Sequence, residues 1–316
     1  MSVTTPRQTT KSTGTRRGDA HAPSLKKTER REALGGALMV SPSVLLLILF
    51  FFIPVGLAFL LAFTNARLIS PSIEFVGLDN FTRLFQDPLF WKSLRNTLYF
   101  AVVVVPLQSA FALLLALVVN VRMRGTNFFR TLYFVPVVTS IVVVSILWKF
   151  MYQPDGLVNS VLQSLSFNAI QGTDWLNNPG SAMPAIIFMS IWQAVGFHMV
   201  IWLSGLQTIA PELYEAADID GATPWQKFRY VTWPGLRSTR TFILVTITIA
   251  ALSLFAQVNI MTNGGPLDAT TTVVFQAVRI GYQQQQTAYA SAISLVFFVL
   301  VLTVSLVQRY LTREKD

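Results

Sequence analysis

The sequence predicts an all-α integral membrane protein with six transmembrane helices. Hydrophobic residues make up 53% of the 316 residues and charged residues only 12%, which is about half the charged share of a soluble domain. The apolar residues also gather into long runs, instead of recurring at the periods that give a soluble fold its polar face. Lipid cannot hydrogen-bond to unpaired backbone groups, so each run is expected to be a helix.

Six stretches of the sequence are long enough to span a bilayer. A hydrocarbon core about 30 Å thick needs roughly 20 apolar residues of helix. The stretches run near 38–63, 97–121, 132–152, 184–207, 241–262 and 288–308. In the first, Ser41 followed by Pro42 predicts a helix start, and Pro54 predicts a kink. Lys149 and His198 are the only residues in these windows that can carry positive charge, and Lys149 is close enough to a window end to reach the headgroups.

The basic residues predict the orientation of these spans. Of the 24 Lys and Arg residues, 18 lie before residue 37, after spans two and four, or in the C-terminal segment. Cytoplasmic segments are enriched in Lys and Arg, so both termini are expected in the cytoplasm. This distribution also accounts for the net charge of +9 without nucleic-acid binding.

Three segments are expected along the chain. Residues 1–36 are rich in Thr, Ser, Arg and Lys and predict a disordered, basic cytoplasmic tail, although an organelle transit sequence would share this composition. Residues 37–310 form the membrane domain, with one long cytoplasmic loop at 208–240. Residues 311–316 form a second short cytoplasmic tail.

Several kinds of chemistry are excluded by what the sequence lacks. It has no cysteine and two histidines, His21 and His198, so a thiolate or histidine-rich metal site is not expected. It also lacks the Gly-x-x-x-x-Gly-Lys-Ser/Thr phosphate loop of ATPases. We therefore expect no catalytic residue, no metal and no cofactor bound by this chain.

The connection 208–240 differs from the other predicted cytoplasmic turns in its length. Pro211 can start a helix and Gly221 can end it in the left-handed conformation. Thr223 is expected to cap a second helix, which Pro234 closes. The sequence therefore predicts two short helices joined by a sharp turn.

The two predicted helices carry residues suited to docking another protein. Acidic residues recur along the first helix beside a pair of alanines small enough to admit a partner's backbone, and Trp225 and Phe228 share a face of the second. The alternative is a connector lying on the bilayer, but interfacial helices favour a basic polar face. The expected docking residues are Glu212, Glu215, Ala216, Ala217, Asp220, Gly221, Ala222, Trp225, Phe228 and Pro234.

These residues resemble a known signature. Glu215-Ala216-Ala217, then Gly221, then Val231, Trp233 and Pro234 are similar to the EAA signature of ABC importer permeases. In that signature the last three positions are Ile, Leu and Pro, so Trp233 is a departure that bears on the packing of the second helix. Further stretches resemble the carbohydrate branch, the maltose-type permeases: 75–81 with Asp87-Pro88, 130–136, and 262–266.

The resemblance covers roughly residues 38–310 and implies the type I ABC importer permease fold. It implies a subunit that imports a sugar or oligosaccharide across a bacterial or archaeal inner membrane by alternating access. It also implies a second related permease, an extracytoplasmic solute-binding protein and two cytoplasmic ATPase subunits that bind ATP and Mg²⁺. The loop would then be the coupling helix, with Glu215 facing an Arg of the ATPase.

The alternative function is an ATP-independent secondary transporter or channel for a small polar solute. Such a protein would need an ion or proton relay at membrane depth, and apart from His198 the spans lack ionisable groups suited to one.

Polar residues at membrane depth usually face the bundle or a water-filled path. The candidates for the translocation path are Trp192, Gln193, His198, Ser253 and Gln257. Aligned through the loop, His198 stands where maltose-type permeases have an aromatic residue that resembles a sugar contact. The alternative is a packing histidine bonded to a neighbouring carbonyl. Ser253 and Gln257, with Thr246, form a polar stripe that could serve binding or packing.

Overall fold

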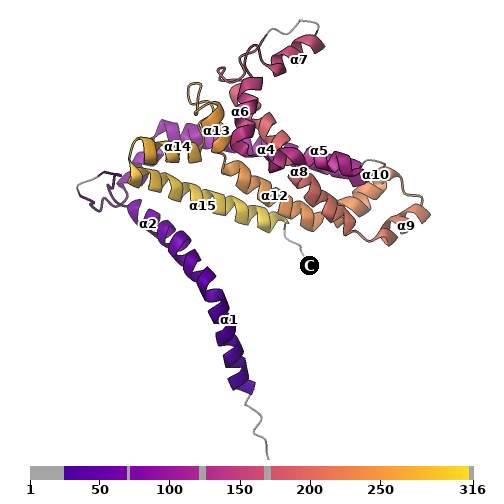
Figure 1. Ribbon diagram of the computed structural model, residues 1–316, viewed down its shortest axis with the longest axis horizontal. Helices are drawn as coiled ribbons and strands as arrows, with labels where there is room; N and C mark the ends of the chain where they lie inside the picture. Colours follow the sequence, from indigo (N-terminus) through magenta and orange to yellow (C-terminus); the bar gives the residue numbers. More distant parts are fainter. Residues whose placement is uncertain (1–24, 70–71, 121–125, 167–171, 313–316) are drawn as a thin grey trace, which may run out of the picture. The chain divides into compact units, whose positions relative to one another are not determined.

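A computed structural model describes residues 25–69, 72–120, 126–166 and 172–312, and within them the protein is helical (Figure 1). In order, with η marking π-helices, the elements are α1 (Leu25–Leu47), η1 (Ile48–Phe52), α2 (Ile53–Leu61), α3 (Asp79–Gln86), α4 (Pro88–Asn120), α5 (Thr126–Val138), α6 (Ile141–Met151), α7 (Leu157–Leu165), α8 (Ala182–Gln207), α9 (Pro211–Ile219), α10 (Pro224–Lys227), η2 (Phe228–Thr232), α11 (Trp233–Gly235), α12 (Arg237–Leu252), α13 (Ala256–Met261), α14 (Val273–Val278), η3 (Arg279–Gln283) and α15 (Thr287–Thr312). The predicted all-α class is confirmed.

Among the described residues, five helical stretches are long and apolar enough to cross a membrane. They are Gly36–Leu61, Pro88–Asn120, Ala182–Gln207, Arg237–Met261 and Thr287–Tyr310. A sixth candidate is the pair Arg130–Val138 and Ile141–Met151, two helices bent by 101° at a short break. Counted as one broken span, this pair completes the predicted set of six.

The chain divides into two compact units, Met1–Gly56 and Leu57–Asp316. In the first unit α1 begins at Leu25, within the stretch predicted to be disordered, whereas residues 1–24 of that stretch lie outside the described residues. Leu, Lys, Arg and Glu predominate just after residue 24, and these are strong helix formers. The predicted helix start at Ser41 is wrong, because α1 runs through Pro42.

A wide helical turn precedes Pro54, where the sequence predicts a kink. The π-helix η1 ends just before α2, and the backbone N–H of Ile53 bonds to the carbonyl of Ile48. A π-turn adds a residue to the helix, which accommodates a proline that has no N–H to donate.

The continuous helix predicted for 132–152 is wrong, because α5 and α6 are separate helices. Pro136 lies inside α5 and removes one backbone donor. Thr139 Oγ1 donates to the carbonyl of Val135 at 3.1 Å, and Ser140 is extended, with φ −54° and ψ 131°. The proline and the hydroxyl of Thr139 together favour a bend here.

The fifth predicted span is also interrupted, between α12 and α13. Thr272, which follows α13 in sequence, donates from Oγ1 to the carbonyl of Leu254 at 2.7 Å. A carbonyl freed by a break in a membrane helix needs such a partner, since lipid offers none. The break is therefore stabilised by a residue 18 positions away.

In the larger unit α4, α8 and α12 form the core. Helices α4 and α8 make the most extensive contact between helices, and α12 packs on α4. Large buried side chains such as Trp202, Met199 and Ile243 fill the space between them. Helix α5 approaches α8 closely at Gly196, where an added Cβ would lie 1.9 Å from the carbonyl oxygen of Tyr133. This position therefore admits no larger residue.

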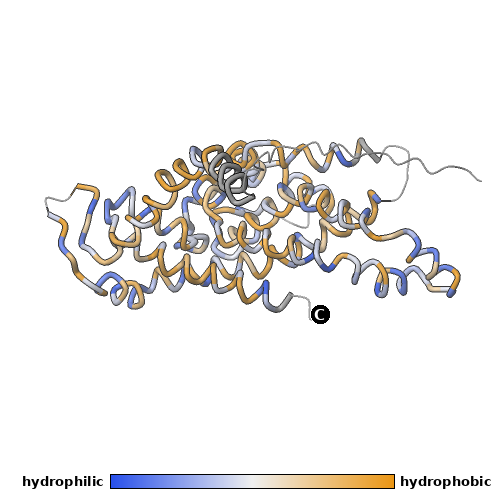
Figure 2. Tube along the Cα trace, turned by 90° about the horizontal axis from the view of Figure 1, so that it is seen from below, coloured by the Kyte–Doolittle hydropathy of each residue, from blue (hydrophilic) through white to orange (hydrophobic). Residues whose placement is uncertain are grey.

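The two ends of the larger unit differ from its middle in polarity. Figure 2 shows hydrophobic residues along the middle of the long helices and hydrophilic residues gathered at both ends. Helices α9 and α10 lie at one end, and α14 lies at the other (Figure 1). The starts of α4 and α8 and the loop 262–272 come together at the end with α14, which packs on α4.

Candidate functional site

The predicted pair of short helices in the 208–240 loop is present in the structure as a helical hairpin formed by α9 to α11. Pro211 occupies the first turn of α9, and Gly221 has φ +71°, the left-handed conformation that glycine adopts without strain. Thr223 and Gln226 form a capping box at the start of α10. Each of these features satisfies backbone groups within the hairpin itself.

The prediction that Pro234 closes the second helix is wrong. The chain passes from α10 through the π-helix η2 into α11, which contains Pro234. In η2 the N–H of Trp233 bonds to the carbonyl of Phe228. This wide turn lets the helix continue past Pro234, which has no N–H to donate. The second arm of the hairpin therefore continues to Gly235.

Side chains lock the two arms together. Tyr214 Oη lies 3.0 Å from Thr232 Oγ1, and Lys227 forms an ion pair with Asp218. Both contacts join α9 to the second arm and hold the two arms against each other.

The hairpin is also attached to the membrane helices. Phe228 packs against Trp233 with ring centroids 6.1 Å apart, and the guanidinium of Arg240 in α12 lies 4.5 Å from the centroid of the Trp233 ring. Ile209, at the end of α8, lies so close to Gly235 that an added Cβ there would be 2.9 Å from it. Trp233, the residue that departs from the EAA signature, thus lies at the junction between the hairpin and α12.

The outer surface of the hairpin is acidic and apolar. Glu212, Glu215 and Asp220 are exposed, as is Ala216, while Ala217 and Ala222 are half-buried. Trp225 is 70% exposed and stacks on Phe228, with ring centroids 5.6 Å apart. Ile219 is 87% exposed and was not predicted as a docking residue. An isoleucine among acidic residues at the end of a helix could have indicated it. An exposed surface of this composition can bind a protein partner.

His198 lies inside the contact between α4 and α8. It is buried, and its Nδ1 lies 2.9 Å from Nε2 of Gln108 in α4 and 3.0 Å from the carbonyl oxygen of Ala194. Nδ1 of His198 accepts a hydrogen bond from the Gln108 amide in one tautomer, and in the other tautomer it donates to the carbonyl of Ala194. Sequence reasoning missed Gln108, a buried glutamine in an apolar span.

The two candidates one turn before His198 differ in exposure. Trp192 is 42% exposed and makes an edge contact with Trp148, ring centroids 5.4 Å apart. Gln193 is half-buried and donates from Nε2 to the carbonyl of Pro136 at 3.4 Å. Trp192 therefore keeps ring surface exposed on the larger unit, whereas the amide of Gln193 is engaged with α5.

The predicted stripe of Thr246, Ser253 and Gln257 does not lie on one continuous helix. Ser253 stands at the break after α12, whereas Gln257 belongs to α13 and is half-buried. Thr246 donates to the carbonyls of Phe242 and Ile243 in its own helix. The break thus separates residues that regular helical spacing would align.

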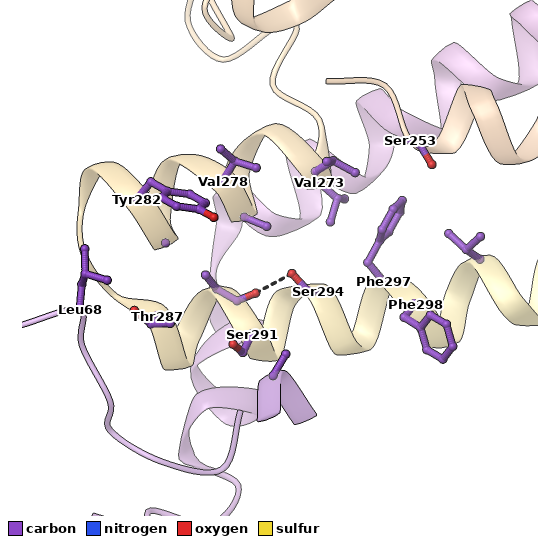
Figure 3. A pocket seen from close by; sticks show the side chains of 16 residues that line it. Leu68, Ser253, Val273, Val278, Tyr282, Thr287, Ser291, Ser294, Phe297 and Phe298 are labelled. Carbon is purple, nitrogen blue, oxygen red and sulfur yellow. Dashed lines mark hydrogen bonds between the residues drawn. The ribbon is translucent and has the colours of Figure 1, made fainter. Parts of the chain in front are cut away.

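Ser253 lines a cavity of about 600 Å³, shown in Figure 3. Its other walls come from α2, from α14 with η3, and from α15. The walls are mainly apolar and include Phe297 and Phe298, with hydroxyls at Tyr282, Thr287, Ser291 and Ser294. The Ser294 hydroxyl donates to the carbonyl of Ala290 at 2.9 Å, so part of this polar surface is already engaged.

Among the residues that the structure describes, no three His, Cys, Asp or Glu side chains come together as a metal site would require. A bundle of membrane-length helices, two of them broken, with an exposed acidic hairpin at one end, is the architecture of a transport permease. The chain belongs to the family of binding-protein-dependent transport system inner membrane components, whose family model matches residues 108–315.

Individual relatives cover almost the whole chain. The lactose transport system permease protein LacF of Rhizobium radiobacter is 35% identical over 286 residues, 89% of this chain and 95% of that protein. The trehalose/maltose transport system permease protein MalF of Thermococcus litoralis is 34% identical, covering 89% and 94%. A crystal structure of a bacterial alginate ABC transporter, in complex with an alginate pentasaccharide-bound periplasmic protein, has a chain with a TM-score of 0.79 and 26% identity, covering 92% and 97%.

Proposed function

We propose that this chain is the permease subunit of an ABC importer that moves a sugar or oligosaccharide into the cytoplasm. Its relatives carry names for lactose, trehalose/maltose and sn-glycerol-3-phosphate transport, and the similar solved transporter imports alginate. These solutes are carbohydrates or a polyol phosphate, which supports a hydroxyl-rich substrate.

The distribution of Lys and Arg supports a cytoplasmic location for both termini and for the hairpin. The connections 62–87, 152–181 and 262–287 then face the outside. A solute-binding protein would deliver solute there, to a pathway shared with a second, related permease.

The observation that carries the proposal is the exposed acidic hairpin, locked to α12 and α8, in a chain of this family. Two ATPase subunits, which bind ATP and Mg²⁺, would grip the hairpins of the two permeases. Glu215 would meet a cation of the ATPase, and Ile219 and Trp225 would supply apolar contacts. Closure of the ATPase pair would then move the hairpin and α12 as one rigid body and switch access to the pathway.

The test is Glu215→Lys in the complex reconstituted in liposomes. We expect the variant to reach the membrane but to lose ATP-dependent uptake and ATPase recruitment, since breaking a desolvated charge pair costs about 2 to 5 kcal/mol. Asp155→Lys also replaces an exposed acid with a lysine, at the opposite end of the unit, and should leave ATPase recruitment intact. Normal uptake by Glu215→Lys would refute the proposal, and uptake by wild-type chain alone without ATP would favour the secondary transporter.

For the translocation path, we propose that Trp192 offers a solute its exposed ring and that Ser253 contributes a hydroxyl at the helix break. Gln193, His198 and Gln257 would support the path from behind. The hydrogen bond between His198 and Gln108 favours a role in holding α4 to α8.

A further inference from the structure

A second pocket lies at the end of the larger unit opposite the hairpin. Its volume is about 520 Å³, and three segments line it: the first turns of α4, the start of α8, and the loop 262–272. The lining residues are Lys92, Arg95, Asn96, Tyr99, Pro179, Gly180, Met183, Pro184, Leu267 and Ala269. We call this the cationic pocket.

The cationic pocket carries two positive charges and no carboxylate among its lining residues. Lys92 donates to the backbone carbonyl of Leu267, so its charge is not neutralised. Arg95 is exposed and forms no ion pair with any described residue. The carboxylate of neighbouring Asp268 is already paired with Arg279 at 3.5 Å. An uncompensated positive potential therefore remains at this site.

The walls of the cationic pocket are ordered. Asn96 donates from Nδ2 to the carbonyls of Asp268 and Thr271, at 3.0 Å each. Thr271 in turn donates to the carbonyl of Gly264 at 3.0 Å. These bonds fix the 262–272 loop against α4, and Lys92 is held by its bond to Leu267, so a ligand does not have to order the walls of the pocket when it binds.

The remaining surface suits a protein loop. Tyr99 is 48% exposed and Leu267 is 80% exposed, and Pro179 and Pro184 line the same pocket. Arginine and tyrosine beside apolar surface are typical of the centre of protein interfaces. The positive N-terminal end of α8, which begins at Ala182, adds to the attraction for an anion.

We propose that the cationic pocket receives an acidic loop of the solute-binding protein, with a carboxylate side chain on Arg95 and Lys92. The inference rests on the proposed function, which puts this end of the chain outside the membrane. A pocket with two cations and an aromatic ring complements an acidic loop in charge. The pocket also lies on the face where the proposed function puts the solute-binding protein.

The experiment measures the dissociation constant of the solute-binding protein for the full transporter complex in nanodiscs. Arg95→Glu should raise it about tenfold, because a like charge then faces the acidic loop. Arg95→Lys should stay near wild type. Arg309→Glu, a matched reversal at an exposed arginine near the C-terminal end of α15, at the end of the unit away from the pocket, should change it little. Added salt should weaken wild-type binding more than that of Arg95→Glu.

The outcomes separate this inference from the proposed function. If wild-type complex binds no solute-binding protein and recruits no ATPase, the proposed function fails. If wild type and Arg95→Glu bind equally well, or Arg309→Glu is as weak as Arg95→Glu, the pocket assignment is overturned while the proposed function stands. If the pocket instead binds a lipid headgroup or a free anionic solute, wild type and Arg95→Glu should bind the solute-binding protein equally well.

Discussion

The hairpin and the loop 262–272 lie at opposite ends of the larger unit and are stabilised in different ways. The hairpin depends on contacts between its own residues: the capping box at Thr223, the ion pair of Lys227 with Asp218, and the bond between Tyr214 and Thr232. Its acids and its tryptophan remain exposed. The hairpin therefore keeps its shape locally and presents its surface to a partner.

The loop 262–272 depends on residues far away in sequence. Asn96 of α4 donates to two of its carbonyls, and Thr272 closes the break at Leu254. Thr270, Thr271 and Thr272 are buried. The end of the loop is thus part of the packed interior, although Leu267 remains exposed. The comparison teaches that one binding surface is stabilised by local contacts and the other by contacts between distant segments.

The largest expected effect is on the loop. Asn96→Leu leaves the buried carbonyl of Thr271 without this donor and removes one of two donors to the carbonyl of Asp268, which together should cost about 3 kcal/mol of stability. Thermal unfolding of the purified protein in detergent measures this cost. Asn259→Leu makes the same change at an exposed position and should lie within about 0.5 kcal/mol of wild type. Equal melting temperatures for Asn96→Leu and wild type would contradict the stabilising role of these bonds.

A change on the hairpin surface should affect binding and not stability. Trp225→Ala removes an exposed ring and should weaken ATPase binding by about 2 kcal/mol, roughly 30-fold, with an unchanged melting temperature. Binding of the ATPase subunit to permease in nanodiscs is the measurement. Trp91→Ala, at a half-exposed tryptophan at the other end, serves as the control. If Trp225→Ala lowers the melting temperature but leaves ATPase binding unchanged, Trp225 stabilises the hairpin and does not contact the partner.

A smaller effect is expected at the hairpin turn. Gly221→Ala should cost about 1 kcal/mol, because a Cβ disfavours the left-handed conformation at φ +71°. The space around it is open, so no clash adds to this cost. Gly221→Asn should lose less, since asparagine tolerates this conformation. Equal losses for the two variants in thermal unfolding would show that backbone strain is not the cause.

The smallest effect concerns the interior between the two ends. A double-mutant cycle with His198→Phe and Gln108→Leu should give a coupling energy of about 0.6 kcal/mol, typical of polar pairs between membrane helices. Thermal unfolding gives the coupling, and uptake assays give KM. Zero coupling together with a raised KM for His198→Phe alone would instead assign His198 to the solute.

The hairpin could be predicted from sequence because its determinants are local. Pro211, Gly221 and Thr223 act on neighbouring backbone groups, and each acts as expected. The break in the third span was missed although Pro136 lies inside that span. The break in the fifth span could not be predicted from its hydropathy, because the residue that stabilises the break, Thr272, lies outside the span. The partnership of His198 with Gln108 likewise depends on how two helices meet.

The most direct test of the central claim uses the absence of cysteine from the sequence. Ile219→Cys places a single thiol on the most exposed apolar residue of the hairpin. Our account predicts that a membrane-impermeant maleimide labels this thiol from the cytoplasmic side alone, and that bound ATPase subunits protect it. Labelling from the outside, or equal labelling with and without the ATPase, would contradict the account.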